Sequence, residues 1–181
     1  MAKELVMWTI FCDDVRQELG GKLSYMGIYG PQLIVPSCPA TLQKVCAAMT
    51  VRVMANHPPK SVLFKLLRND DVIYEHAVDD SALQAMAGSV PAADLDGRYI
   101  AVGVVAQIVN VEIAERGFLR ARAIVDGEEL RGGSLEMLAA EWARARSTAR
   151  AAAAIRCGRS RASARAGGRA RPRGTPSART R

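Results

Sequence analysis

The chain opens on an extended, largely apolar segment. Residues 4–11 are largely apolar on both faces of an extended segment, which predicts a strand covered on both sides. Four charged side chains follow within residues 12–18, so we expect the strand to end there in a charged loop. Gly20-Gly21 then permits a turn, and residues 23–29 form the next predicted strand. Gly27 in its interior indicates a bulge or a close backbone approach.

Short extended segments recur to about residue 138. The further predicted strands cover residues 33–35, 45–54, 62–68, 72–78, 99–113, 118–125, 128–131 and 134–138. Asn69-Asp70-Asp71 and Asp126-Gly127 predict hairpin turns. The segment 99–113 exceeds a usual strand, which predicts a bend or break near Gln107 or Asn110. Residues 82–87, ended by Gly88, predict a short helix, with a loop as the alternative.

Eight or nine short strands with little helix predict a mainly β fold. An antiparallel β-sandwich of the immunoglobulin-like, Greek-key kind suits the pattern, and a small β-barrel is the alternative. Long helical crossovers are lacking in the pattern, which argues against a parallel α/β sheet.

The charge divides the chain in two. Residues 1–138 hold 13 Lys and Arg against 17 Asp and Glu, a net charge of −4. Residues 139–181 hold 12 Arg and one acidic residue, a net of +11, so the total of +7 belongs to this tail. We therefore predict a β-sandwich domain at 1–138 and an Arg/Ala-rich low-complexity tail at 139–181, disordered or partly helical. The tail holds twelve Arg and no Lys, and Arg, Ala, Gly and Pro share GC-rich codons. We therefore hypothesise that the tail is frameshift-derived. Translation of the gene in its other frames tests this hypothesis.

Several classes of function lack a signal in the sequence. The four cysteines, Cys12, Cys38, Cys46 and Cys157, form no CxxC pair, and only two histidines could join them in a zinc site. No metal or cofactor is expected, because neither glycine pair has the spacing of a phosphate-binding loop. The first residues lack a secretory signal and no run approaches 18 apolar residues, so we expect a cytoplasmic protein with reduced thiols and no membrane contact.

The stretch from Phe11 to Gly30 reads FCDDVRQELGGKLSYMGIYG. It resembles the opening of an uncharacterised family of small bacterial and phage-associated proteins, classed as a domain of unknown function. That opening is an apolar strand, then CDDxRxE, a Gly-Lys pair and a strand that ends in a Gly-aromatic turn. The resemblance implies a compact, mostly β domain to about residue 138, with no assigned activity and no catalytic residues. The tail has no counterpart in it.

The charged stretch after the first strand is the candidate partner-binding loop, formed by Asp13, Asp14, Arg16 and Glu18. Carboxylates near Cys12 also suit a hard cation, but their spacing matches no calcium loop. Pairing with Arg16 or Lys22 and capping of the loop backbone account for them without a ligand. No catalytic residue is predicted, because nothing in the spacing pairs a cysteine with a histidine.

The leading hypothesis is a non-catalytic interaction or self-association module, whose exposed sheet edges pair with a partner strand. The alternative is a nucleic-acid-associated protein that contacts the phosphate backbone through the tail. The candidate phosphate contacts are Arg159, Arg161, Arg165, Arg169, Arg171 and Arg173. The tail has no aromatic residue after Trp142, so base stacking is not expected.

Overall fold

The computed structural model describes residues 5–89, 91 and 98–142 of the 181-residue chain. It divides the chain into one compact unit, Met1–Glu141, and a second, Trp142–Arg181. The six arginines predicted to contact phosphate lie outside the described residues, as does most of the predicted tail. The boundary at residue 138 and the state of the tail therefore stay predictions.

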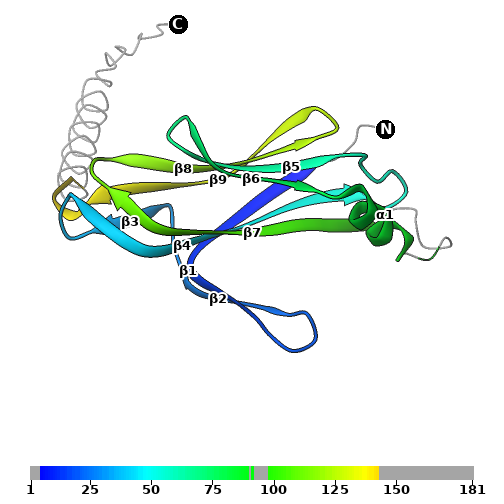
Figure 1. The fold of residues 1–181 in the computed structure, drawn as a ribbon, viewed down its shortest axis with the longest axis horizontal. Helices are drawn as coiled ribbons and strands as arrows, with labels where there is room; N and C mark the ends of the chain where they lie inside the picture. Colours follow the sequence, from blue (N-terminus) through cyan, green and yellow to red (C-terminus); the bar gives the residue numbers. More distant parts are fainter. Residues whose placement is uncertain (1–4, 90, 92–97, 143–181) are drawn as a thin grey trace, which may run out of the picture. The chain divides into compact units, whose positions relative to one another are not determined.

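The strands form two sheets packed as a sandwich (Figure 1). One sheet has the order β2-β1-β4-β7 and the other β3-β9-β8-β5-β6. The elements are β1 Val6–Gln17, β2 Leu23–Ile28, β3 Gln32–Val35, β4 Ala40–Met54, β5 Val62–Arg68, β6 Asp71–Val78, α1 Asp80–Gly88, β7 Tyr99–Ile113, β8 Gly117–Val125 and β9 Glu128–Ala139. The predicted sandwich is confirmed and the barrel alternative is wrong, since the described strands form two open sheets.

The core lies between the sheets and follows from alternation along the strands. In β8 every second residue is buried from Gly117 to Val125, and in β4 the buried inward positions run from Val45 to Val53. Large side chains such as Phe64, Met49 and Leu135 are fully buried between them. Burial of each such side chain contributes about 1.5–3 kcal/mol, so this interface is the main source of stability.

One strand pair departs from the predicted antiparallel pattern. The chain leaves β2 in the first sheet and crosses at Pro31, whose carbonyl accepts a hydrogen bond of 3.0 Å from the amide of Glu136. It then enters the second sheet as β3, which pairs parallel with β9 from Gln32↔Glu136 to Val35↔Ala139. Every other strand pair in the two sheets is antiparallel.

The first predicted loop is wrong, because β1 continues through the charged residues to Gln17. Beyond Cys12 the strand gains a new neighbour: β2 pairs with it from Cys12↔Ile28 to Gln17↔Leu23. This pairing satisfies the backbone, so the charges do not end the strand. The expectation that β1 is covered on both sides is also wrong, since Val6 and Trp8 are exposed.

Glycines explain why two predicted strands form a single strand in the structure. The segments predicted at 128–131 and 134–138 form one strand, β9, which passes through Gly132-Gly133. A Cβ atom at Gly132 would lie 2.6 Å from Oγ1 of Thr9, so the glycine lets β9 approach β1 closely. The long segment 99–113 is likewise one strand, with the predicted irregularity visible as a positive φ of 53° at Asn110.

The predicted turns and the predicted helix agree with the structure. Asn69 has a positive φ in the predicted hairpin turn, and both Asp126 and Gly127 have a positive φ in the other. Helix α1 occupies the predicted helical segment. No helix within the described residues is long and apolar enough to cross a membrane.

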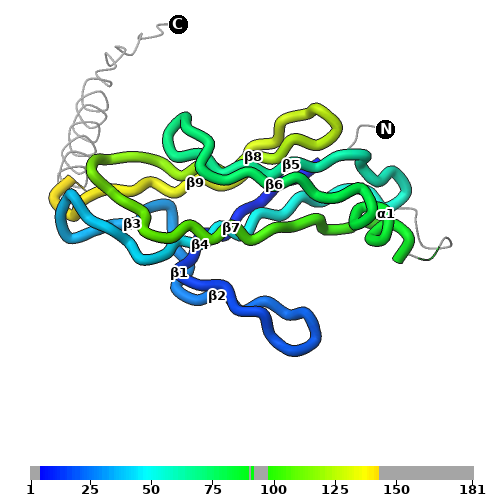
Figure 2. The backbone as a smooth tube through the Cα atoms, in the orientation of Figure 1, coloured from blue at the N-terminus to red at the C-terminus, as the bar shows by residue number. Residues whose placement is uncertain are grey.

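The outer half of β1 and the whole of β2 form a hairpin that extends away from the other strands (Figure 2). We call residues 13–28 the hairpin arm. It exists because β1 pairs with β4 only from Val6 to Cys12, whereas its remaining residues pair with β2. The arm therefore places β2 at a free edge of the four-stranded sheet.

Candidate functional site

A cluster of charged, phenolic and thiol side chains lies where the arm leaves the sheet. We call this group the hairpin base; it consists of Cys12, Asp13, Asp14, Tyr29, Lys44 and Cys46. Strand β1 supplies the first three residues, the segment after β2 supplies the tyrosine, and β4 supplies the last two.

Asp14 links the arm to β4. Its Oδ1 accepts a hydrogen bond from Lys44 Nζ at 2.5 Å, and its Oδ2 lies 3.5 Å from Arg16 Nε. The hydrogen bond from Lys44 lowers the pKa of Asp14, and the same bond raises the pKa of Lys44. Both side chains are about one-third exposed, so solvent screens the pair and its role is to orient the arm more than to stabilise the fold.

Asp13 occupies space that a glycine leaves open. It lies opposite Gly27, and a Cβ atom there would stand 1.9 Å from Asp13 Oδ2. Gly27 also has a φ of +64°, which L side chains adopt only with strain. The Tyr29 hydroxyl donates a hydrogen bond to Asp13 Oδ1. Burial, and then this bond to a carboxylate, raise the pKa of Tyr29. The close backbone approach predicted at Gly27 is present.

Two cysteines face each other beneath the arm. Cys12 of β1 is the register partner of Cys46 of β4, both are fully buried, and both are free thiols. The Cys46 Sγ–H donates to the carbonyl of Asp13 at 3.6 Å. Burial raises the pKa of Cys12 to about 11, and the neighbouring Cys46 is the second cause of this shift. Burial also raises the pKa of Cys46. Both thiols are therefore protonated at neutral pH, which makes them poor nucleophiles.

The structure brings together only part of the predicted partner-binding loop. Asp13 and Asp14 belong to the hairpin base and Arg16 reaches Asp14, but Glu18 lies in the turn, where its amide donates to the carbonyl of Lys22 at 2.8 Å. The sequence predicted that these acidic residues pair with Arg16 or Lys22. In the structure, Asp14 pairs with Lys44. Within the described ranges, no group of three Cys, His, Asp or Glu side chains is arranged to hold a metal ion.

Sequence reasoning missed Lys44 and Tyr29. Tyr29 stands 16 positions from Asp13, and Lys44 stands 30 positions from Asp14. Tyr29 lies in the Gly-aromatic turn of the opening stretch, but no local pattern connects either residue to its carboxylate. The glycine at 27 was the available signal, because a glycine inside a strand marks a point where another group approaches.

Exposed apolar side chains lie on both faces of β2. Leu23 and Met26 are each 43% exposed and Ile28 is 61% exposed, all on β2. Beside them, a groove of about 170 Å³ lies between β2 and the strands β4 and β7. Its lining residues include Leu23, Tyr25, Ala48, Thr50, Gly103 and Val105. The sequence could not show this surface, because it depends on which strand stands at the edge of the sheet.

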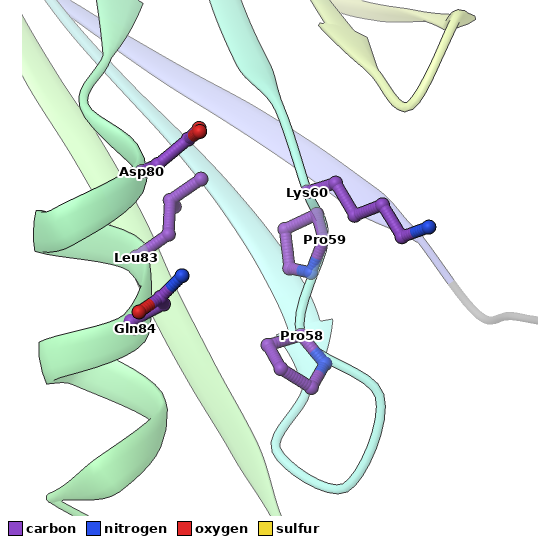
Figure 3. A pocket seen from close by; sticks show the side chains of 6 residues that line it. All are labelled: Pro58, Pro59, Lys60, Asp80, Leu83 and Gln84. Carbon is purple, nitrogen blue, oxygen red and sulfur yellow. The ribbon is translucent and has the colours of Figure 1, made fainter.

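A second pocket lies between α1 and the loop before β5. It has a volume of about 360 Å³ and is lined by Pro58, Pro59, Lys60, Asp80, Leu83 and Gln84. Figure 3 shows the Lys60 side chain extending away from the helix, while Leu83 points toward the two prolines. Polar groups do not converge in this pocket, and we assign it no chemistry.

Comparison with known proteins gives one match. A model described as "Family of unknown function (DUF6941)" matches residues 7–137, well over half of the chain. No curated protein and no solved structure matches.

The first prediction concerns Gly27, which has both a positive φ and a close contact with Asp13. Gly27→Ala should destabilise the protein more than Gly20→Ala. Both positions have positive φ, which costs a non-glycine residue about 1–2 kcal/mol, but only at Gly27 does a Cβ atom meet another group. Urea unfolding measures both free energies. Equal losses would show that the contact with Asp13 does not constrain position 27.

The second prediction concerns acid. A lowered pKa in the folded state means that Asp14 stabilises the protein above the ordinary carboxyl pKa, and that this contribution is lost as the pH falls through the lower value. Lys44→Met should therefore weaken the protein at neutral pH, and the difference from the wild type should shrink below about pH 4. Thermal unfolding between pH 7 and pH 2.5 measures it. A difference that stays constant over this range would contradict the pairing.

Proposed function

We propose that this chain, which belongs to the Family of unknown function (DUF6941), acts by protein–protein contact and not by catalysis, through the free edge of β2. The observation that carries the proposal is an uncharged edge strand with exposed apolar side chains. In the described part of the chain, β2 pairs with β1 on one side and with no strand on the other.

Edge strands usually carry features that block pairing with other chains. Lysine, proline or an inward charge are the common ones, and residues 23–28, LSYMGI, contain none of them. The backbone groups on the free side of such a strand can pair with another strand, while alternate side chains supply contacts. Leu23, Met26 and Ile28 are exposed here, and the side chains of an added strand would pack beside them.

The partner we propose is a second copy of the same chain. Two β2 strands placed antiparallel about a twofold axis perpendicular to the sheet keep each side chain on its own face, so Met26 of each copy would lie opposite Met26 of the other, and Ser24 opposite Ile28. No like charges are opposed in this register, and a twofold interface uses the same surface on both subunits. The groove beside Leu23 and Tyr25 gives the incoming apolar side chains a place to pack.

Two observations at the hairpin base support a non-catalytic role. The thiols of Cys12 and Cys46 are fully buried, and burial raises their pKa values, so they are poorly suited to nucleophilic attack. The carboxylate of Asp14 is already bound by Lys44. These contacts serve to fix the arm.

The charge of the tail supports a second candidate function. Residues 139–181 carry a net charge of +11, whereas residues 1–138 carry −4. In this proposal the arginines at 159, 161, 165, 169, 171 and 173 neutralise phosphates of a nucleic acid without reading its sequence. The acidic body would contribute little to such binding.

Origin and location are also proposals. The resemblance of the opening FCDDVRQE supports a bacterial or phage-associated protein, and the three described cysteines, all free, suit a reducing cytoplasm. The genes that neighbour this one would test both points.

The third prediction tests self-association. Met26→Lys should shift the full chain from dimer to monomer, because it places a charge inside the paired edge. Val72→Lys is the matched control, since Val72 is 50% exposed on β6, an edge strand of the other sheet. Sedimentation over a range of protein concentrations measures the state. A wild type that stays monomeric, or equal effects of the two variants, would contradict pairing through β2.

The fourth prediction tests the tail. A chain that ends after Glu141 keeps all of β9, which runs to Ala139, and should lose the DNA binding of the full chain. The full chain should bind less tightly as salt rises, because each neutralised phosphate releases counterions. Fluorescence anisotropy with a duplex of arbitrary sequence measures both. Binding retained by the shortened chain would rule out the tail as the contact.

A further inference from the structure

We infer that Cys12 and Cys46 are an oxidation site, at which a low-molecular-weight disulfide converts two thiols into an intramolecular cystine that ties β1 to β4. The inference does not depend on the proposed self-association. It starts from the register, which places the two residues directly opposite each other on neighbouring antiparallel strands.

The geometry suits a disulfide. Opposite residues of an antiparallel pair have Cα atoms about 4.5 or 5.5 Å apart, depending on their hydrogen bonding. Disulfides span Cα separations of about 4.4–6.8 Å, so both cases fall within this range. Because side chains alternate along each strand, opposite residues also point to the same face of the sheet. The bond therefore requires no change of register.

The same sheet excludes other partners for this pair. Cys12 and Cys46 are fully buried, whereas Cys38 is only partly buried and lies between β3 and β4. A thiol on a second molecule cannot reach a fully buried sulfur without opening of the structure. The two buried thiols therefore react with each other once either has been activated.

The chemistry balances with oxidised glutathione as the oxidant. One cysteine thiolate attacks a glutathione sulfur, which forms a mixed disulfide and releases one glutathione thiolate. The second cysteine then attacks the protein sulfur of that mixed disulfide, closes the Cys12–Cys46 bond and releases the second glutathione thiolate. The two protons from the cysteines pass to the released thiolates, so the protein loses two electrons and glutathione disulfide gains them.

Opening of the hairpin base controls the rate of the first step. Burial keeps both thiols protonated and out of reach of glutathione. Exposure of Cys12 requires the groups that cover this face of the sheet to move, and the Lys44–Asp14 bond joins β4 to the arm next to the cysteines. Loss of that bond should therefore make oxidation faster, while the product stays the same.

The experiment uses the full chain with Cys38→Ala and Cys157→Ala, which leaves only the two cysteines of the pair. The folded, reduced protein is incubated with oxidised glutathione at pH 8, quenched in acid, unfolded and alkylated, and its mass is measured. We expect loss of both alkylatable thiols with no retained glutathione, and a Cys12–Cys46 peptide after digestion. Adding Lys44→Met should speed the loss. The same protein incubated in urea is the control, in which mixed disulfides should accumulate.

Three results would overturn the inference. They are a stable glutathione adduct on either cysteine of the folded protein, a disulfide-linked dimer, or two free thiols at equilibrium. Thermal unfolding of the oxidised product gives an independent readout. We expect a higher unfolding temperature than in the reduced protein, because the bond joins residues that are already paired. A lower temperature, with loss of the native aromatic circular dichroism, would show that the bond distorts the sheet and would equally contradict the inference.

Discussion

The four-stranded sheet and the hairpin arm both depend on how β4 is paired. Its inward side chains from Val45 to Val53 lie in the middle of the core, and β7 pairs with it along its whole length. On its other side, β1 pairs with it only from Val6 to Cys12. The rest of β1 needs a different backbone partner, because unpaired peptide groups are costly to bury. Strand β2 supplies that partner, and the hairpin arm and its free edge are the consequence.

The hairpin base holds this change of partner in place. Ion pairs that solvent screens, such as the partly exposed Lys44–Asp14 pair, contribute little net stability, so the buried cysteines and the close contact of Asp13 with Gly27 are the stronger constraints. Both act on the residues where β1 leaves β4. An arm anchored there presents the apolar side chains of β2 without disturbing the core. The same anchoring explains why two thiols are held face to face and yet shielded from solvent.

The sequence predicted those features that depend on local chemistry. Alternating apolar residues located most of the strands, and the turns at Asn69 and Asp126-Gly127 followed from residues that tolerate positive φ. The charged run after Cys12 was misread as a loop, because charge reports solvent contact and not backbone pairing. The partner of Asp14 lies 30 positions away on another strand, and no local pattern connects it to Lys44. The parallel pairing of β3 with β9 is hidden for the same reason.

Hydrogen exchange of the β2 amides at low and high protein concentration tests the central claim most directly. If a second copy pairs with this edge, amides within Leu23–Ile28 that point away from β1 should become protected as concentration rises. Amides on the free edge of β6 should exchange at the same rate throughout. Exchange in β2 that does not depend on concentration, or protection that appears at β6 instead, would contradict the account.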